Sequence, residues 1–175
     1  DTILVSPGNY LENLVYPEHR VTVMSTDGPD FTFLVAPEVL SLAASDRIPE
    51  KPASADSTLL SLTEGNSLVY VGYADSGSSF EGFTVTGCDY IPCLVLVDAA
   101  LHFEISNNRF VDNNSYDVLR GWDQASLIMT RNLISNSAEG NAVVTTGPNC
   151  RFINNTVSGG ARGLAIYGPY STVLN

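Results

Sequence analysis

The feature of this chain that most restricts its fold is an internal repeat. Each copy consists of an apolar residue, any two residues, an asparagine, any one residue and a second apolar residue. The copies recur at nearly even spacing, and their second apolar residue falls at positions 85, 110, 134 and 157. The copies are Phe80–Val85, where Phe83 replaces the asparagine, Ile105–Phe110, Met129–Ile134 and Phe152–Val157. A fifth copy begins near the end, where Gly168–Asn175 repeats the pattern of Gly147–Asn154. A period of this length is typical of a stacked solenoid.

Each period also contains a second strand-like segment. The runs are short, rich in β-branched residues, and separated by Gly, Asn, Ser and Asp turns, whereas apolar stripes of helical spacing are nearly absent. These segments are Leu94–Val97, Val118–Leu119, Val143–Val144 and Leu164–Ile166. Two or three short strands per period describe one rung of a parallel β-helix, in which stacked rungs supply the hydrogen bonds and build an apolar column. The predicted fold class is therefore an all-β solenoid of about seven rungs.

The repeated asparagines predict a ladder. Eleven of the fourteen asparagines lie from Asn107 onwards, and Asn108, Asn132 and Asn155 recur at one point of the repeat. Asparagine tolerates left-handed turns, and its amide both donates and accepts hydrogen bonds, so stacked copies can bond from rung to rung. Ligand binding by these asparagines is the alternative interpretation. We expect the structural ladder.

The first half of the chain is less regular but still strand-like. Strands are expected in segments 1–10, 21–24, 31–35, 58–62 and 68–73. Residues 41–57, rich in Ala, Ser and Pro, do not fit the repeat, and we interpret them as a loop insertion. Such a loop can form a binding wall, or it can be a tolerated surface insertion. We expect a single domain over residues 1–175, cut from a longer chain because both ends fall within strand-like runs.

The repeat Ile/Phe-x-x-Asn-x-apolar resembles the right-handed, single-stranded parallel β-helices of the pectate-lyase-like superfamily. Residues 1–15, with a strand, the Pro7-Gly8 turn and Tyr10-x-Glu12, resemble the first coil of that superfamily. There a capping helix precedes this coil, and no such helix precedes Asp1 in this sequence. The superfamily includes polysaccharide lyases, glycoside hydrolases, esterases, epimerases and non-catalytic surface proteins. The resemblance implies an extracellular, periplasmic or cell-surface location and a polysaccharide partner.

Charge excludes two classes of partner. The chain has 8 Lys and Arg against 19 Asp and Glu, a net charge of −11. Such a surface repels phosphate backbones and anionic lipids, so we expect no nucleic-acid binding. No apolar run reaches the ~18 residues of a membrane span, so we expect no membrane insertion. We interpret Arg109, Arg131 and Arg151 as solvated charges that balance the acidic surface.

A calcium site of the lyase kind would need a column of carboxylates, because calcium takes six to eight oxygen ligands. Aligning the second strands places Asp98 beside Trp122 and Thr145, whereas a step of 25 places it beside Asp123. Neither register gives a column of three acids. The sequence therefore predicts no metal and no cofactor. His19 and His102 are isolated in the sequence, and we interpret both as structural.

Hydrolases of this fold use paired carboxylates about 5 to 9.5 Å apart. Asp98, Asp117 and Asp123 are the candidate catalytic residues, because all three lie around the second strands of two rungs. Arg120 and Trp122 are the candidate substrate-binding residues, because a guanidinium and an indole beside these acids could contact a sugar. The alternatives are that Trp122 covers the core and that Arg120 forms a surface ion pair.

The leading functional hypothesis is an extracellular β-helix domain that binds or helps to process a polysaccharide. The alternative is a structural or adhesive surface module with no small-molecule site. Unpaired strands in the end rungs would also allow self-association. Two cysteines, Cys88 and Cys93, enclose a loop short enough to bridge, with buried free thiols as the other interpretation.

Overall fold

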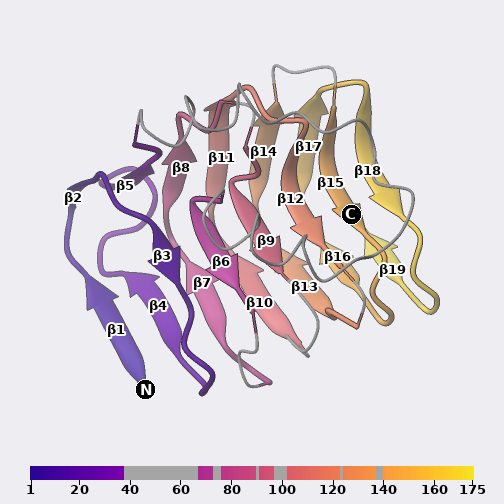
Figure 1. Ribbon diagram of the computed structural model, residues 1–175, viewed down its shortest axis with the longest axis horizontal. Helices are drawn as coiled ribbons and strands as arrows, with labels where there is room; N and C mark the ends of the chain where they lie inside the picture. Colours follow the sequence, from indigo (N-terminus) through magenta and orange to yellow (C-terminus); the bar gives the residue numbers. More distant parts are fainter. Residues whose placement is uncertain (38–66, 73–75, 90, 97–101, 123, 137–139) are drawn as a thin grey trace.

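The chain is an all-β parallel solenoid whose rungs stack along its long axis (Figure 1). The computed structural model describes residues 1–37, 67–72, 76–89, 91–96, 102–122, 124–136 and 140–175, and this part contains no helix. No membrane-spanning helix is found among these residues. The insertion expected at 41–57 and the strand expected at 58–62 lie outside them.

Three parallel sheets form the sides of the solenoid, and each complete rung contributes one strand to each sheet. Sheet A contains β1 (Thr2–Val5), β4 (Thr22–Ser25), β7 (Ser79–Glu81), β10 (Phe103–Ser106), β13 (Leu127–Thr130), β16 (Arg151–Ile153) and β19 (Thr172–Leu174). Sheet B contains β2 (Gly8–Tyr10), β5 (Thr32–Val35), β8 (Thr84–Thr86), β11 (Arg109–Asn113), β14 (Leu133–Asn136) and β17 (Thr156–Gly159). Sheet C contains β3 (Leu14–Val15), β6 (Val69–Val71), β9 (Leu94–Leu96), β12 (Asp117–Gly121), β15 (Asn141–Thr145) and β18 (Arg162–Ile166).

The predicted number of rungs was slightly too high. Among the described residues only sheet A has seven strands, and sheets B and C have six each. The solenoid therefore has fewer complete turns than the seven predicted from the sequence, because β19 begins a rung that gains no strand in the other two sheets.

Successive copies of the sequence repeat pair with one another in sheets A and B, so the spacing of the repeat sets the register of these sheets. Ile105 pairs with Phe80 on one side and Met129 on the other, and Met129 pairs with Phe152. Phe152 in turn pairs with Val173, as the fifth copy predicts. The first four of these side chains point inward and stack into an apolar column, which confirms the alignment of the copies.

The core is built from three such columns, one for each sheet. The column of sheet C runs through Leu94, Leu119 and Val143, all fully buried. The burial weakens at both ends of the solenoid, where Ile3 is 50% exposed and Val173 is 51% exposed. The interior rungs therefore contribute most of the hydrophobic stabilisation.

Of the two registers considered for the second strands, the described pairs of β9 and β12 follow the step of 25 and not the one that would place Asp98 beside Trp122. Leu119 pairs with Leu94, a step of 25, so Arg120 lies beside Val95 and Val144. Thr145 correspondingly pairs with Gly121 and not with Trp122. Consecutive residues are buried in β9 and β12, so alternation between inward and outward side chains could not fix the register.

The asparagine ladder is present. Asn132 Oδ1 accepts the backbone N–H of Asn108 at 3.0 Å, and Asn132 Nδ2 donates to the Ile105 carbonyl at 2.8 Å. Asn155 makes the same pair of bonds one rung later, to the Asn132 N–H at 2.9 Å and to the Met129 carbonyl at 2.9 Å. Each side chain therefore pairs two backbone groups of the preceding rung that would otherwise be buried without partners.

A second position of the same kind was missed. Asn113 Oδ1 accepts the Cys88 N–H at 3.0 Å, and Asn113 Nδ2 donates to the Val85 carbonyl at 3.0 Å. This is the ladder bonding pattern at the next corner of the rung. Asn136 holds the same position one rung later, but a register shift between Phe110 and Asn113 alters the spacing, and Gly159 holds the position two rungs later.

Candidate functional site

Asp117 and Arg120 lie on β12 and Trp122 directly follows it, and Arg120 forms the ion pair that was the alternative to sugar contact. Asp117 Oδ2 accepts two hydrogen bonds from Arg120, from Nε at 2.8 Å and from Nη2 at 2.6 Å. Its other oxygen, Oδ1, accepts from Asn141 Nδ2 at 2.6 Å. Asp117 is only 8% exposed, so this carboxylate is enclosed and fully partnered. Asp98 and Asp123 lie outside the described residues.

The indole of Trp122 lies under the guanidinium group. The Arg120 Cζ atom is 5.6 Å from the Trp122 ring centroid, a cation–π distance. The Trp122 backbone N–H donates to the Leu96 carbonyl at 3.0 Å, which holds the residue against the neighbouring rung. Its Nε1 atom is buried without a hydrogen-bond partner among the described residues. Arg120 therefore contacts both the Asp117 carboxylate and the Trp122 indole.

This arrangement is poorly suited to acid–base catalysis. A general acid or base must exchange a proton with substrate, and both oxygens of the enclosed Asp117 carboxylate are already occupied by Arg120 and Asn141. Within the described ranges there is also no group of three or more His, Cys, Asp or Glu side chains that could hold a metal ion. His19 lies 3.5 Å from the exposed Asp1 carboxylate, and His102 lies 3.5 Å from Ser76 Oγ.

The structure contains a hollow that the sequence did not indicate. It lies at the corner between sheets A and B and has a volume of about 310 Å³. Its lining consists of Pro29, Asp30, Asn107, Asn108, Arg109, Arg131 and Leu133. We call it the A–B corner hollow. It combines two guanidinium groups, one carboxylate and amide groups with the apolar surfaces of a proline and a leucine.

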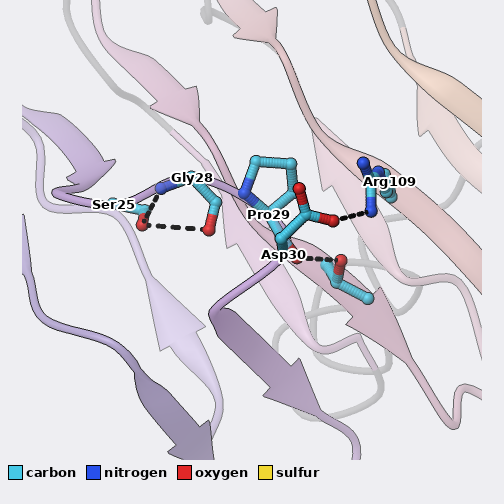
Figure 2. A network of polar contacts seen from close by, with 6 residues as sticks. Ser25, Gly28, Pro29, Asp30 and Arg109 are labelled. Carbon is cyan, nitrogen blue, oxygen red and sulfur yellow. Dashed lines mark hydrogen bonds and ion pairs between the residues drawn. The ribbon is translucent and has the colours of Figure 1, made fainter.

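One wall of the hollow is a turn fastened to sheet B (Figure 2). Asp30 forms an ion pair with Arg109, which projects from β11. The carbonyl of Pro29 accepts a hydrogen bond from Thr84 Oγ1 at 2.6 Å. Before the turn, Ser25 Oγ accepts the Gly28 N–H at 2.9 Å. Arg109 is thus a partly exposed charge that pairs with an acidic surface residue, which agrees with the role predicted for it.

The other wall follows the corner residues of successive rungs. Asn107, Arg131 and Asn154 adopt left-handed conformations, with φ of 55°, 55° and 53°. Asn107 Nδ2 donates to Glu81 Oε1 at 2.7 Å. Arg131 is exposed and occupies the corner position that asparagine holds in the rungs on either side. A left-handed residue other than glycine or asparagine costs roughly 1 kcal/mol.

Sequence reasoning missed this hollow because its two walls are far apart in the chain. Asp30 precedes Arg109 by 79 residues, and the two meet only because β5 pairs with β8 and β8 with β11. The one available signal was the recurrence of arginine near the start of neighbouring second-half rungs.

The three cysteines are buried free thiols. Cys88, Cys93 and Cys150 are all fully buried, and none forms a disulfide bond. Of the two possibilities left open for Cys88 and Cys93, this structure contains the reduced form.

Comparisons with known proteins returned no match to this chain among protein-family models, curated proteins or solved structures.

Proposed function

We propose that this domain binds a polysaccharide at the A–B corner hollow and does not cleave it. The observation that carries the proposal is the lining of the hollow, which places Arg109, Arg131, Asp30 and Asn107 beside Leu133. Sugar rings present hydroxyl groups that need directed donors and acceptors, together with apolar C–H faces that pack on aliphatic side chains. Rungs spaced ~4.8 Å apart also present a repeating surface to a repeating polymer.

Arg131 gives further support. Its backbone is held in the left-handed region, where the neighbouring rungs use asparagine at the same corner. Non-glycine residues such as His102 and Tyr170 share this backbone region, so the support comes from the exposed position of the Arg131 side chain in the lining of the hollow. We therefore assign Arg131 as the principal ligand-contacting cation, since Arg109 is already paired with Asp30.

Binding is favoured over processing by the state of Asp117. Its two oxygens are occupied by Arg120 and Asn141. We retain membership of the pectate-lyase-like superfamily as a proposal that rests on the repeat and on the first-coil pattern. The extracellular, periplasmic or cell-surface location belongs to the same proposal.

A glycan array followed by calorimetry on a panel of uronate and neutral oligosaccharides tests the proposal. The Arg131→Ala variant should bind about ten times more weakly than the wild type, the loss expected for one charge-assisted hydrogen bond. Arg151→Ala is the matched control, because this exposed arginine lies one rung away and outside the hollow. If the wild type binds none of the glycans, or if both variants lose the same affinity, the site is rejected.

The same glycans should be assayed for new reducing ends and for unsaturated products. We expect neither, because Asp117, the candidate carboxylate that the structure describes, is enclosed by Arg120 and Asn141. If products form and Asp117→Asn abolishes them, the active site is the cluster of Asp117, Arg120 and Trp122. That result would contradict the non-catalytic interpretation.

A second candidate is a structural surface module that self-associates through the edge strands β1 and β19. It is favoured by Ile3 and Val173, apolar side chains of the end strands that remain half-exposed. Sedimentation velocity at several protein concentrations separates this candidate from the first, because a sugar-binding module has no need of a concentration-dependent mass.

A further inference from the structure

Two of the buried thiols, Cys88 and Cys93, belong to the same corner of the solenoid, between β8 and β9. Cys88 follows β8 and Cys93 immediately precedes β9, and both are fully buried. Cys93 is near enough to Cys88 to contribute, after burial, to the raised pKa of its thiol. Ser115 lies against both residues, with Oγ 3.9 Å from Cys93 Sγ and 3.3 Å from the Cys88 carbonyl oxygen.

The backbone on either side of this pair is held by the adjacent rungs. Cys88 donates its N–H to Asn113 Oδ1 at 3.0 Å and accepts from the Asn114 N–H at 2.8 Å. The Cys93 N–H donates to the Val118 carbonyl at 3.0 Å, and the Cys93 carbonyl accepts from Val69 at 2.8 Å. The backbone of each cysteine is therefore held by hydrogen bonds to neighbouring rungs.

Cys150 does not compete for either partner. It lies at a different corner, where its Sγ atom contacts Thr145 Oγ1 at 3.3 Å and the Gly147 carbonyl at 3.4 Å. A disulfide bond forms only between cysteines whose Cβ atoms approach to about 4 Å. Only Cys88 and Cys93 share a corner of the solenoid, so they are the pair that such a bond could join.

We propose that Cys88 and Cys93 are a redox-dependent staple, present as thiols in reducing conditions and joined by a disulfide bond in oxidising ones. The oxidant is a low-molecular-weight disulfide such as oxidised glutathione. One cysteine thiolate attacks it, forming a mixed disulfide and releasing one glutathione thiol. The second cysteine thiolate then displaces the other glutathione thiol, so the protein loses two protons and two electrons and glutathione disulfide is reduced.

The surroundings make the pair structural and not catalytic. Burial, followed by the hydrogen bond and charge interaction with Cys93, raises the pKa of Cys88 well above its ordinary value. A thiol held protonated is a poor nucleophile. The first exchange therefore proceeds through opening of this turn or before the core closes, and the finished bond is then shielded from reductants.

Equilibration of the whole chain in glutathione redox buffers, followed by acid quenching, alkylation in denaturant and peptide mass spectrometry, tests the staple. In oxidised buffer, the peptide containing both cysteines should lose the mass of two hydrogen atoms and resist alkylation, while Cys150 remains alkylatable. The melting temperature should rise by about 5 °C relative to the reduced protein.

Two variants separate the staple from a general effect of oxidation. The Cys150→Ser variant should keep the full shift, whereas Cys93→Ser should lose both the mass change and the rise in melting temperature. The wild-type peptide map decides the question even if Cys93→Ser does not fold. Free Cys88 and Cys93 in fully oxidised buffer, or bonds of either residue to Cys150, would overturn the proposal.

Discussion

At the scale of single residues, the ladder asparagines are essential because each connects two rungs. The Asn132 side chain accepts from Asn108 and donates to Ile105, while its own N–H and amide both donate to Asn155. No other side chain of this size offers an acceptor and a donor in that arrangement. This position was predictable from the sequence because the same chemistry recurs in three copies, whereas Asn113 was missed because a register shift alters the spacing of its column, which ends in a glycine, Gly159.

Replacing Asn132 with alanine should lower the free energy of unfolding by about 3 kcal/mol, because it leaves a buried N–H and a buried carbonyl without partners. Urea unfolding followed by circular dichroism measures the loss. Asn114→Ala is the matched control, since Asn114 is exposed and its side chain bonds to Asp89 at 2.7 Å. The control should lose less than about 1 kcal/mol. Equal losses in the two variants would contradict the ladder.

Tyr16 should make the fold sensitive to alkali. It is 4% exposed, its hydroxyl donates to the Ser79 carbonyl at 2.6 Å, and burial raises its pKa far above the ordinary value. Above pH ~10 the unfolded chain ionises this phenol while the folded chain keeps its proton, so stability falls as pH rises.

For this single group the slope is about 1.4 kcal/mol per pH unit. The Tyr16→Phe variant should be less stable than the wild type at neutral pH because it loses the hydrogen bond, yet its stability should decline less steeply above pH ~10. Urea titrations at a series of alkaline pH values compare the two slopes. Parallel declines would show that Tyr16 does not contribute to the alkaline loss.

At the scale of elements, the inward columns decide which strands pair. Sheets A and B could be aligned from the sequence because large apolar residues such as Phe80, Ile105 and Phe110 alternate with polar ones. Sheet C could not be aligned unambiguously, because β9 and β12 carry consecutive buried residues. This difference explains why the sequence did not identify the neighbours of Arg120.

Close stacking of the corners depends on particular glycines. A Cβ atom on Gly147 would lie 1.8 Å from the Ala125 carbonyl oxygen, and this neighbour is backbone of the adjacent rung. Gly147→Ala should therefore cost about 3 kcal/mol or prevent cooperative folding. Gly163→Ala is the control, because its Cβ would meet only Val157 Cγ1 at 3.5 Å. Thermal unfolding should leave the control within about 0.5 kcal/mol of the wild type.

The turn that walls the A–B corner hollow should behave as one unit. Thr84→Val removes the bond to Pro29 and should cost about 1 kcal/mol, and Arg109→Ala breaks the exposed pair with Asp30 and should cost about 0.5 kcal/mol. Because both contacts hold the same turn, the double variant should depart from additivity by about 0.5 kcal/mol. A double-mutant cycle in urea measures this coupling. Strict additivity would mean that the two contacts act independently.

At the scale of the whole molecule, the candidate site depends on contacts between distant segments. Thr22 and Ser79 are far apart in the chain, yet they pair directly in sheet A. Asp30 and Arg109 meet across three strands of sheet B for the same reason. The sequence shows the second-half repeat directly, but it does not show which first-half strands continue each column. The fold class was therefore predictable, while the hollow required the structure.

The central claim is that neighbouring strands of sheet A lie one rung apart, however many residues separate them in the sequence. Pulsed electron paramagnetic resonance tests it with one spin label at position 172 and a second at 2, 22 or 79. The labels can be attached through introduced cysteines, because the three native cysteines are fully buried and protected from labelling. These positions lie six, five and four strands from β19 in sheet A. The account predicts distances of about 29, 24 and 19 Å, in equal steps of ~4.8 Å. A step from 22 to 79 several times larger than the step from 2 to 22 would contradict it.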